Sequence, residues 1–172
     1  IMPSLVGSEM CIRDRIGTVS SAKKAEYAKQ QGAWATIDYS HENVAQRVLE
    51  LTEGKKCPVV YDGVGKDTWE TSLDCVAPRG LLVSFGNASG AVTGVNLGIL
   101  SQKGSLYVTR PTLAGYANTA DNLQKMADEL FGMIAKGKLS VEIAQRYPLS
   151  EAATAQTLLS DRKTTGSTIL VP

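Results

Sequence analysis

The chain has 172 residues, 43% of them hydrophobic, which is enough to bury the core of one domain. Its 18 basic and 17 acidic residues leave a formal net charge of +1. This balance does not favour binding to nucleic acid or to a membrane surface through bulk charge, and no apolar run approaches the roughly 20 residues that cross a bilayer.

The first fifteen residues, IMPSLVGSEMCIRDR, lack the order of a secretory signal, which places charge before an apolar run of about 7–15 residues. The three cysteines, Cys11, Cys57 and Cys75, are odd in number and widely spaced, which argues against a disulfide framework. His41 is the only histidine and has no cysteine near it, so the sequence predicts no metal site. We therefore expect a cytoplasmic protein without zinc.

From residue 16 onward, short apolar runs alternate with stretches of helix-favouring residues. Ser20 or Ser21 is placed to cap the first helix, and Gly32 to end it. In chain order the first half predicts a strand in IGTVS (16–20), a helix in SAKKAEYAKQQG (21–32), a strand in WATIDY (34–39), a helix in ENVAQRVLELTEG (42–54) and a strand in PVVYDGV (58–64).

The second half continues the alternation. GLLVSFGN (80–87) is apolar on both faces, as expected of a strand inside a covered parallel sheet. The other predicted elements are a helix in KDTWETSLDCVA (66–77), a strand in SLYVTRP (105–111), a long amphipathic helix in TADNLQKMADELFGMIAKGK (119–138), a helix in SEAATAQTLLSDRK (150–163) and a strand in STILVP (167–172).

Regular alternation of strand and helix implies parallel strands joined by right-handed crossovers, so the predicted fold is a doubly wound α/β sheet. Ligands of such sheets bind beyond the carboxyl ends of the strands. The residues to consider are therefore those that follow each predicted strand: 20–24, 38–39, 62–66, 85–90 and 109–111.

The loop after the first strand reads Ser20-Ser21-Ala22-Lys23-Lys24 and contains no carboxylate. NAD sites use an acidic residue here for the ribose 2′-hydroxyl, whereas basic and hydroxyl groups suit a 2′-phosphate. A helix N-cap followed by solvated lysines explains the same residues, so this loop alone leaves both interpretations open.

In YDGVGKDTW, Gly63 and Gly65 follow a strand, but Thr68 stands where a dinucleotide-binding G-x-G-x-x-G motif has its third glycine. We therefore expect glycines that let backbone pass close to a ligand rather than a first-strand phosphate loop. The segment Phe85-Gly86-Asn87 offers a flat apolar group, a close-approach position and an amide. These suit a nicotinamide ring, although an ordinary turn also uses Gly and Asn.

The sequence shows no nucleophile constellation, because its one histidine lies in SHEN at a predicted helix start. We interpret Asp62 and Asp74 as surface or turn residues rather than as a paired acid and base. Hydride transfer from a nicotinamide requires no protein nucleophile, so these observations are consistent with a redox enzyme. The catalytic residues remain unassigned.

Taken together, residues 16–172 resemble the medium-chain dehydrogenase/reductase superfamily, and within it the zinc-free quinone oxidoreductases related to zeta-crystallin. The most specific segments are GAWATIDY (32–39), VVYDGVGKDTWETSLDCVAPRGLLVSFGNASGAVTGVNLGILSQKGSLYVTRPTL (59–113) and YPLSEAATAQTLLSDRKTTGSTILVP (147–172). The resemblance implies a Rossmann-type sheet, NADPH as cofactor, and a quinone or another small electrophilic carbonyl compound as substrate. It also implies a homodimer joined through the edge strand in SLYVTRP.

The resemblance further implies roles for particular residues. Ser21 and Lys24 would hold the 2′-phosphate end of NADPH, and Tyr39 would lie beside its adenosine. The other contacts, along the cofactor cleft and at the nicotinamide half, would come from Val64, Gly65, Phe85, Gly86 and Asn87, and from Arg162 in the closing segment.

The family's first strand, its glycine-rich pyrophosphate loop and the following helix should precede IGTVS, after a GroES-like catalytic domain. Strand, loop and helix need roughly 25–30 residues, more than the fifteen that precede IGTVS. We therefore expect a C-terminal fragment with residues 1–15 as an artefactual leader, 16–145 as a partial NADPH-binding domain and 146–172 as a segment that packs on the absent catalytic domain.

Such a fragment should have a gap at mid-sheet, because the missing strand is central in the order 3-2-1-4-5-6, and should bind NADPH weakly. Two alternatives to a quinone reductase remain open. One is a zinc-free reductase of the same superfamily that acts on enones or enoyl thioesters. The other is a non-enzymatic NADPH-binding or RNA-binding role, although the near-neutral charge argues against RNA.

Overall fold

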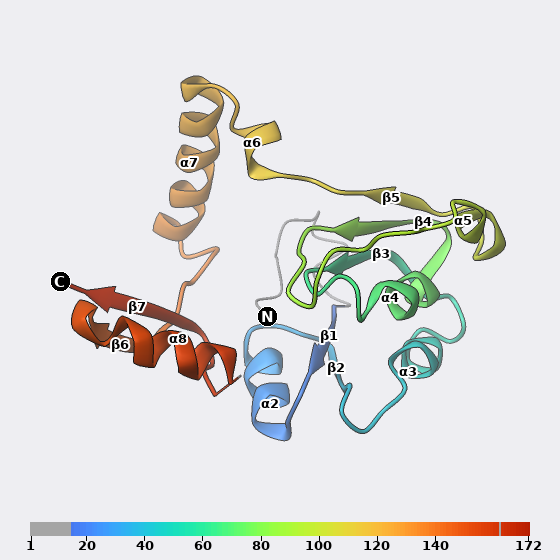
Figure 1. The fold of residues 1–172 in the computed structure, drawn as a ribbon, viewed down its shortest axis with the longest axis horizontal. Helices are drawn as coiled ribbons and strands as arrows, with labels where there is room; N and C mark the ends of the chain where they lie inside the picture. The colour runs from blue at the N-terminus through green and yellow to red at the C-terminus, as the bar shows by residue number, and fades with distance from the viewer. Residues whose placement is uncertain (1–14, 162) are drawn as a thin grey trace. The chain divides into compact units, whose positions relative to one another are not determined.

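The computed structural model describes residues 15–161 and 163–172, in which strands and helices alternate along the chain (Figure 1). The strands are β1 (Ile16–Val19), β2 (Ala35–Asp38), β3 (Cys57–Asp62), β4 (Val76–Ser84), β5 (Tyr107–Thr109), β6 (Ile143–Pro148) and β7 (Ser167–Val171). The helices are α2 (Ala22–Gln30), α3 (Val44–Leu51), α4 (Trp69–Cys75), α5 (Gly98–Gln102), α6 (Leu113–Tyr116), α7 (Ala120–Ala135) and α8 (Ala152–Ser160), with a 3-10 turn η1 (Leu149–Glu151).

All strand pairs are parallel. β1 pairs with β2 in a two-stranded sheet, and β3, β4 and β5 form a three-stranded sheet in that order. The β3–β4 ladder is regular from Val59, opposite Leu81, to Asp62, opposite Ser84, and is irregular before Val59. The predicted α/β class with parallel strands is therefore confirmed.

Two clusters of buried side chains hold these sheets against their helices. One consists of Leu73, Val76, Leu82 and Leu106, and the other of Ile37, Val48 and Cys75. The partly buried Val60 of β3 packs against both clusters. The core is thus continuous from the β2–α3 side of the sheet to α4 and β5.

The parallel sheet is interrupted between β1 and β3. In the strand order 3-2-1-4-5-6, β2 and β1 take places 3 and 2, and β3, β4 and β5 take places 4, 5 and 6. Among the residues that the structure describes, no strand takes the central place, and β1 and β3 are not joined by a ladder. Because residues 1–14 lie outside the described part of the chain, the gap that the sequence predicts at mid-sheet stays a prediction.

Contacts divide the described residues into two compact units, 15–112 and 113–172. In the second unit β6 and β7 form a separate parallel pair, and α8 lies between them in the chain. The domain boundary expected between residues 145 and 146 stays a prediction, and residues 1–14 of the leader expected at 1–15 lie outside the described residues. Within the described part of the chain, no helix is both long enough and apolar enough to cross a membrane.

Candidate functional site

The loops that follow β3 and β4 lie side by side at the carboxyl ends of these two strands. We call residues 63–68 and 85–90 together the paired loops. Phe85 N donates to the carbonyl oxygen of Asp62 (2.8 Å), and Ser89 N donates to that of Val64 (2.8 Å). Lys66 N donates to the carbonyl oxygen of Gly90 (3.1 Å). The two loops are therefore bonded to each other along their length.

Glycines allow the two backbones to approach this closely. A Cβ atom on Gly65 would lie 2.6 Å from the carbonyl oxygen of Gly90, and Gly65 itself has a φ of +93°. A Cβ atom on Gly86 would overlap the backbone of Gly63, and one on Gly63 would lie 2.9 Å from Cζ of Phe85. Side chains at these positions would separate the loops, which explains the glycines without a phosphate-binding motif.

Asp62 ends β3 and is only 5% exposed, so it is not a surface residue; of the two interpretations offered, surface or turn residue, its contacts fit the second. Its Oδ1 atom accepts from Val64 N (2.8 Å) and Gly65 N (3.0 Å). Its Oδ2 atom accepts from the hydroxyls of Thr68 (2.8 Å) and Ser72 (2.7 Å). One carboxylate thus holds both the turn after β3 and the start of α4, and the Thr68 hydroxyl is used for this rather than for a ligand.

Burial alone raises the pKa of the Asp62 carboxyl, but the hydrogen bonds to it together outweigh burial. The net pKa of Asp62 therefore lies below its ordinary value. Because the pKa is lowered, this carboxyl is ionised at neutral pH and cannot act there as a general acid.

Arg110, which follows β5, connects that strand to the paired loops. Its Nη1 atom donates to the carbonyl oxygen of Ser84 (2.7 Å). In the orientation of the Asn87 amide that gives both its nitrogen and its oxygen a partner, the nitrogen donates to the carbonyl oxygen of Gly86 (2.8 Å) and the oxygen accepts from Arg110 Nη2 (3.3 Å). Arg110 therefore fixes the direction of the Asn87 side chain, a role that sequence reasoning missed.

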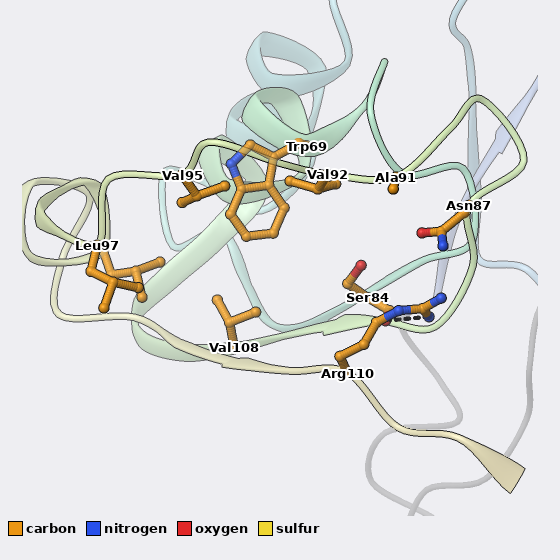
Figure 2. A pocket seen from close by; sticks show the side chains of 10 residues that line it. Trp69, Ser84, Asn87, Ala91, Val92, Val95, Leu97, Val108 and Arg110 are labelled. Atoms are coloured by element: carbon orange, nitrogen blue, oxygen red, sulfur yellow. Dashed lines mark hydrogen bonds between the residues drawn. The ribbon is translucent and has the colours of Figure 1, made fainter. Parts of the chain in front are cut away.

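These groups form the polar end of a cavity of about 390 Å³ (Figure 2). Ser84, Asn87 and Arg110 gather at one end, and the other end is apolar. The apolar lining comes from Trp69, Ala91, Val92, Val95, Leu97, Leu100 and Val108. An apolar hollow with a few convergent polar groups is typical of small-molecule sites.

The loop after β1 enters α2 without any acidic residue in the first turn. Ser21 caps this helix, its hydroxyl accepting from Lys24 N (3.4 Å). Tyr39 N donates to the carbonyl oxygen of Val19 (3.1 Å), so the loops after β1 and β2 begin at the same end of their sheet. The structure thus brings Ser21, Lys24 and Tyr39 to the carboxyl ends of β1 and β2.

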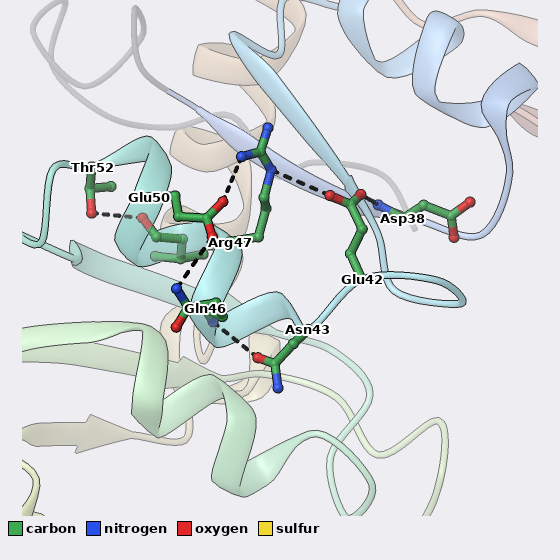
Figure 3. Close-up of polar contacts among 8 residues, drawn as sticks. Asp38, Glu42, Asn43, Gln46, Arg47, Glu50 and Thr52 are labelled. Carbon is green, nitrogen blue, oxygen red and sulfur yellow. Dashed lines mark hydrogen bonds and ion pairs between the residues drawn. The ribbon is translucent and has the colours of Figure 1, made fainter.

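The end of β2 is held by Glu42, which precedes α3 and is itself paired with Arg47 of that helix (Figure 3). Oε1 of Glu42 accepts from Asp38 N (2.8 Å), and Arg47 pairs with both Glu42 (3.3 Å) and Glu50 (2.7 Å). The pKa of Asp38 is lowered, first by the hydrogen bond from the backbone of Ser40. The Asp38 carboxylate is therefore bonded to Ser40 and His41 of its own turn, next to Tyr39, the predicted adenosine contact.

Within the part of the chain that the structure describes, no three His, Cys, Asp or Glu side chains gather in a way that could hold a metal ion. Cys57 and Cys75 are free thiols. Burial raises the pKa of both, and that of Cys75 reaches about 11 with additional effects from Cys57 and Asp74. Their low thiolate content makes both poor candidates for a nucleophile.

The nine residues predicted to contact the cofactor have different outcomes. Val64, Gly65, Phe85, Gly86 and Asn87 come together in the paired loops, whereas Ser21, Lys24 and Tyr39 lie beyond the carboxyl ends of β1 and β2. Arg162 lies outside the described residues. Their roles in binding stay predictions.

Comparison with known proteins gives a consistent result. The family described as zinc-binding dehydrogenase matches residues 31–170. The chain is 76% identical over 157 residues to the quinone oxidoreductase of Pseudomonas aeruginosa, which covers 91% of this chain and 48% of that protein. It is 41% identical over 158 residues to a 2-haloacrylate reductase of a Burkholderia species, covering 91% of this chain and 47% of that protein.

Among solved structures, the chain resembles the Escherichia coli quinone oxidoreductase complexed with NADPH, with a TM-score of 0.88 and 56% identity. That match covers 92% of this chain and 49% of the other. The chain therefore spans about half the length of the curated relatives it matches.

Proposed function

We propose that this chain, which belongs to the family described as zinc-binding dehydrogenase, forms the NADPH-binding part of a quinone oxidoreductase of the medium-chain dehydrogenase/reductase superfamily. The whole enzyme would transfer reducing equivalents from NADPH to a quinone or another small electrophilic carbonyl compound. The observation that carries this proposal is the 56% identity, across 92% of the chain, to a quinone oxidoreductase whose structure contains NADPH.

The paired loops fit the nicotinamide half of this cofactor. They lie at the carboxyl ends of β3 and β4, where ligands of parallel sheets bind, and their glycines let the two loop backbones approach each other closely. The Phe85 ring is 42% exposed and offers a flat apolar face. Bound NADPH would supply a hydride, and we propose that Val64, Gly65, Phe85, Gly86 and Asn87 orient the ring that carries it.

The start of α2 fits the 2′-phosphate end. Lys24 and the capping Ser21 lie in its first turn, where the helix dipole favours an anion and no carboxylate opposes it. We propose that these two residues select NADPH over NADH, and that Tyr39 lies against the adenosine. Arg162, from the closing segment, remains part of this proposal.

The cofactor preference is tested by replacing Lys24 with alanine and measuring NADPH and NADH binding to the 172-residue chain by NMR titration. We expect Lys24→Ala to weaken NADPH binding about tenfold, because a charge-assisted contact is lost, while NADH binding changes little. Lys29→Ala, in the last turn of the same helix, is the matched control. Equal losses for both cofactors would contradict the proposed role of Lys24.

The reaction is tested in a chimaera in which residues 16–172 replace the matching half of the P. aeruginosa quinone oxidoreductase. We expect this chimaera to consume NADPH when 1,4-benzoquinone is added, and to consume little NADH. No turnover by a folded chimaera would contradict the proposal. Reduction of 2-haloacrylate in preference to quinone would favour the second candidate, to which the 41% identity to a 2-haloacrylate reductase points.

We also propose that the intact protein is a homodimer joined through SLYVTRP, residues 105–111. β5 is the outer strand of the β3-β4-β5 sheet, and its Tyr107 is 65% exposed. An open strand edge of this kind pairs readily with another copy of itself. Sedimentation of the chimaera with and without Val108→Pro, which removes a backbone amide from β5, tests this pairing.

A further inference from the structure

Asp62 and Ser89 both form hydrogen bonds with the loop at 63–68, and neither is among the proposed cofactor contacts. The Asp62 carboxylate accepts hydrogen bonds from four donors, three in the first loop and one in α4. Ser89 belongs to the second loop and bonds to the first. The hydrogen bonds of both side chains go to backbone and hydroxyl groups of the protein itself.

Asp62 matters because its charge is buried. A buried carboxylate is tolerated where several donors satisfy it, and its removal leaves those donors without partners. The donors here are the Val64 and Gly65 amides and the Thr68 and Ser72 hydroxyls. The shape of the loop at 63–68 therefore depends on one carboxylate.

Ser89 fixes the position of one loop relative to the other. Its hydroxyl donates to the carbonyl oxygen of Val64 (2.9 Å) and accepts from Asp67 N (3.0 Å). Its backbone N–H donates to the same Val64 carbonyl oxygen (2.8 Å). One residue thus makes three hydrogen bonds across the gap between the loops.

We infer that Asp62 and Ser89 are positioning residues, which hold the paired loops in the shape needed to receive the nicotinamide half of NADPH before the cofactor arrives. Neither side chain touches the cofactor, and each acts through the backbone of Val64 and Gly65. The inference rests on the proposed cofactor site. Binding benefits because loops that are already ordered lose little conformational entropy when the ligand arrives.

The first test compares Asp62→Asn with Asp121→Asn in the full 172-residue chain, followed by NMR. Asp121 is an exposed carboxylate in the first turn of α7, so the control makes the same chemical change in the other contact unit. In the unsubstituted chain, the amide proton shifts of Val64 and Gly65 should titrate together as the Asp62 carboxyl ionises. In Asp62→Asn this titration should disappear, and the Gly65 amide should exchange with solvent about tenfold faster or more.

The second readout is the NADPH titration at millimolar cofactor. We expect Asp62→Asn to weaken binding about tenfold and Ser89→Ala about threefold, in line with the loss of charged and neutral hydrogen bonds. Asp121→Asn and Ser101→Ala should stay within about twofold of the unsubstituted chain. Exchange at the core amides of Leu73 and Leu82 shows whether each variant keeps its fold.

The outcomes separate the inference from the proposed function. If NADPH shifts the amides of residues 85–87 equally in Asp62→Asn and in the unsubstituted chain, the cofactor site stands and the positioning role is overturned. If NADPH shifts no amide of the paired loops in the unsubstituted chain, the cofactor site itself is overturned. Weaker binding in Asp62→Asn and Ser89→Ala, with intact core amides, supports both.

Discussion

At the scale of single residues, the candidate site depends on positions where no side chain fits. Gly86 is the clearest, because its Cα faces the backbone of Gly63 and a Cβ atom would overlap it. The neighbouring loop cannot move away without breaking the bonds that Ser89 and Asp62 make across and beneath it. A single added methyl group at Gly86 should therefore displace both paired loops.

We predict that Gly86→Ala lowers the free energy of unfolding by about 1–3 kcal/mol, the usual cost of overpacking. Gly17→Ala is the control, since a Cβ atom there would meet only Ala33 and Ala28 at 3.9 and 4.0 Å. That change should be neutral or slightly stabilising, because glycine is unfavourable inside a strand. Urea unfolding of both variants measures the difference, and similar losses for the two would refute the close-approach argument.

A pH prediction follows from the buried carboxylate. The folded-state pKa of Asp62 lies below its unfolded value of about 3.9, so its ionised form favours the folded state. This contribution is present above about pH 3.9 and is lost as the pH falls through the folded pKa. The free energy of unfolding should therefore fall more steeply between about pH 5 and pH 2 in the unsubstituted chain than in Asp62→Asn.

Urea titrations at several pH values measure this difference. The lowered pKa values of Asp38 and Glu50 contribute equally to both proteins, so they do not affect the comparison. Parallel curves for the two proteins would show that the hydrogen bonds to Asp62 do not stabilise its charge.

At the scale of elements, local pattern predicted most strands and helices, and pairing decided the rest. β6 was missed because its sequence, IAQRYP, has no clear apolar periodicity and becomes a strand by pairing with β7. β4 begins at Val76 rather than at residue 80, because α4 continues directly into it. In the sequence, Pro78 and Gly80 look like a turn rather than part of a strand. In the structure, Arg79 between them has a φ of 60°.

The site shows the same division. The rule that ligands bind beyond strand ends brought Val64 and Phe85 into consideration, since it needs only the order of elements. The roles of Asp62, Ser89 and Arg110 depend on which loops lie beside each other. Ser89 and its partner Val64 are 25 residues apart in the chain, and no sequence pattern over that distance indicates that the two loops are neighbours. In the sequence, only Asp62, placed before Gly63 and followed by Thr68, indicates a turn held by a side chain.

Two helices with apolar stripes should respond differently to truncation. Leu73 of α4 is fully buried in the core, whereas Leu130 of α7 is 47% exposed. We predict that Leu73→Ala lowers the free energy of unfolding by about 2–5 kcal/mol and that Leu130→Ala lowers it by less than about 1 kcal/mol. Chemical denaturation of the two variants decides this, and a large loss for Leu130→Ala would mean that α7 is buried in solution.

At the scale of the whole molecule, the described chain consists of two contact units, and both tryptophans, Trp34 and Trp69, lie in the first. Contact units of this kind can differ in stability, so unfolding need not be a single transition. The two units can be followed independently because fluorescence reports one and circular dichroism reports both.

We predict that tryptophan fluorescence and far-ultraviolet circular dichroism give different urea midpoints. Fluorescence should follow residues 15–112, while circular dichroism should also record the helices α7 and α8 of the second unit. Coincident transitions would show that the two units unfold as one. The same experiment on Trp34→Phe isolates Trp69, which packs against the core cluster of α4 and β4.

The interruption between β1 and β3 has a consequence for handling the protein. Within residues 15–161 and 163–172, each of these strands has a ladder on one side only. Strand edges without a ladder accept any extended peptide, including the same segment from a neighbouring molecule. Concentrated samples should consequently tend toward intermolecular β-structure and precipitation, and short peptides that add a parallel strand should keep them clear.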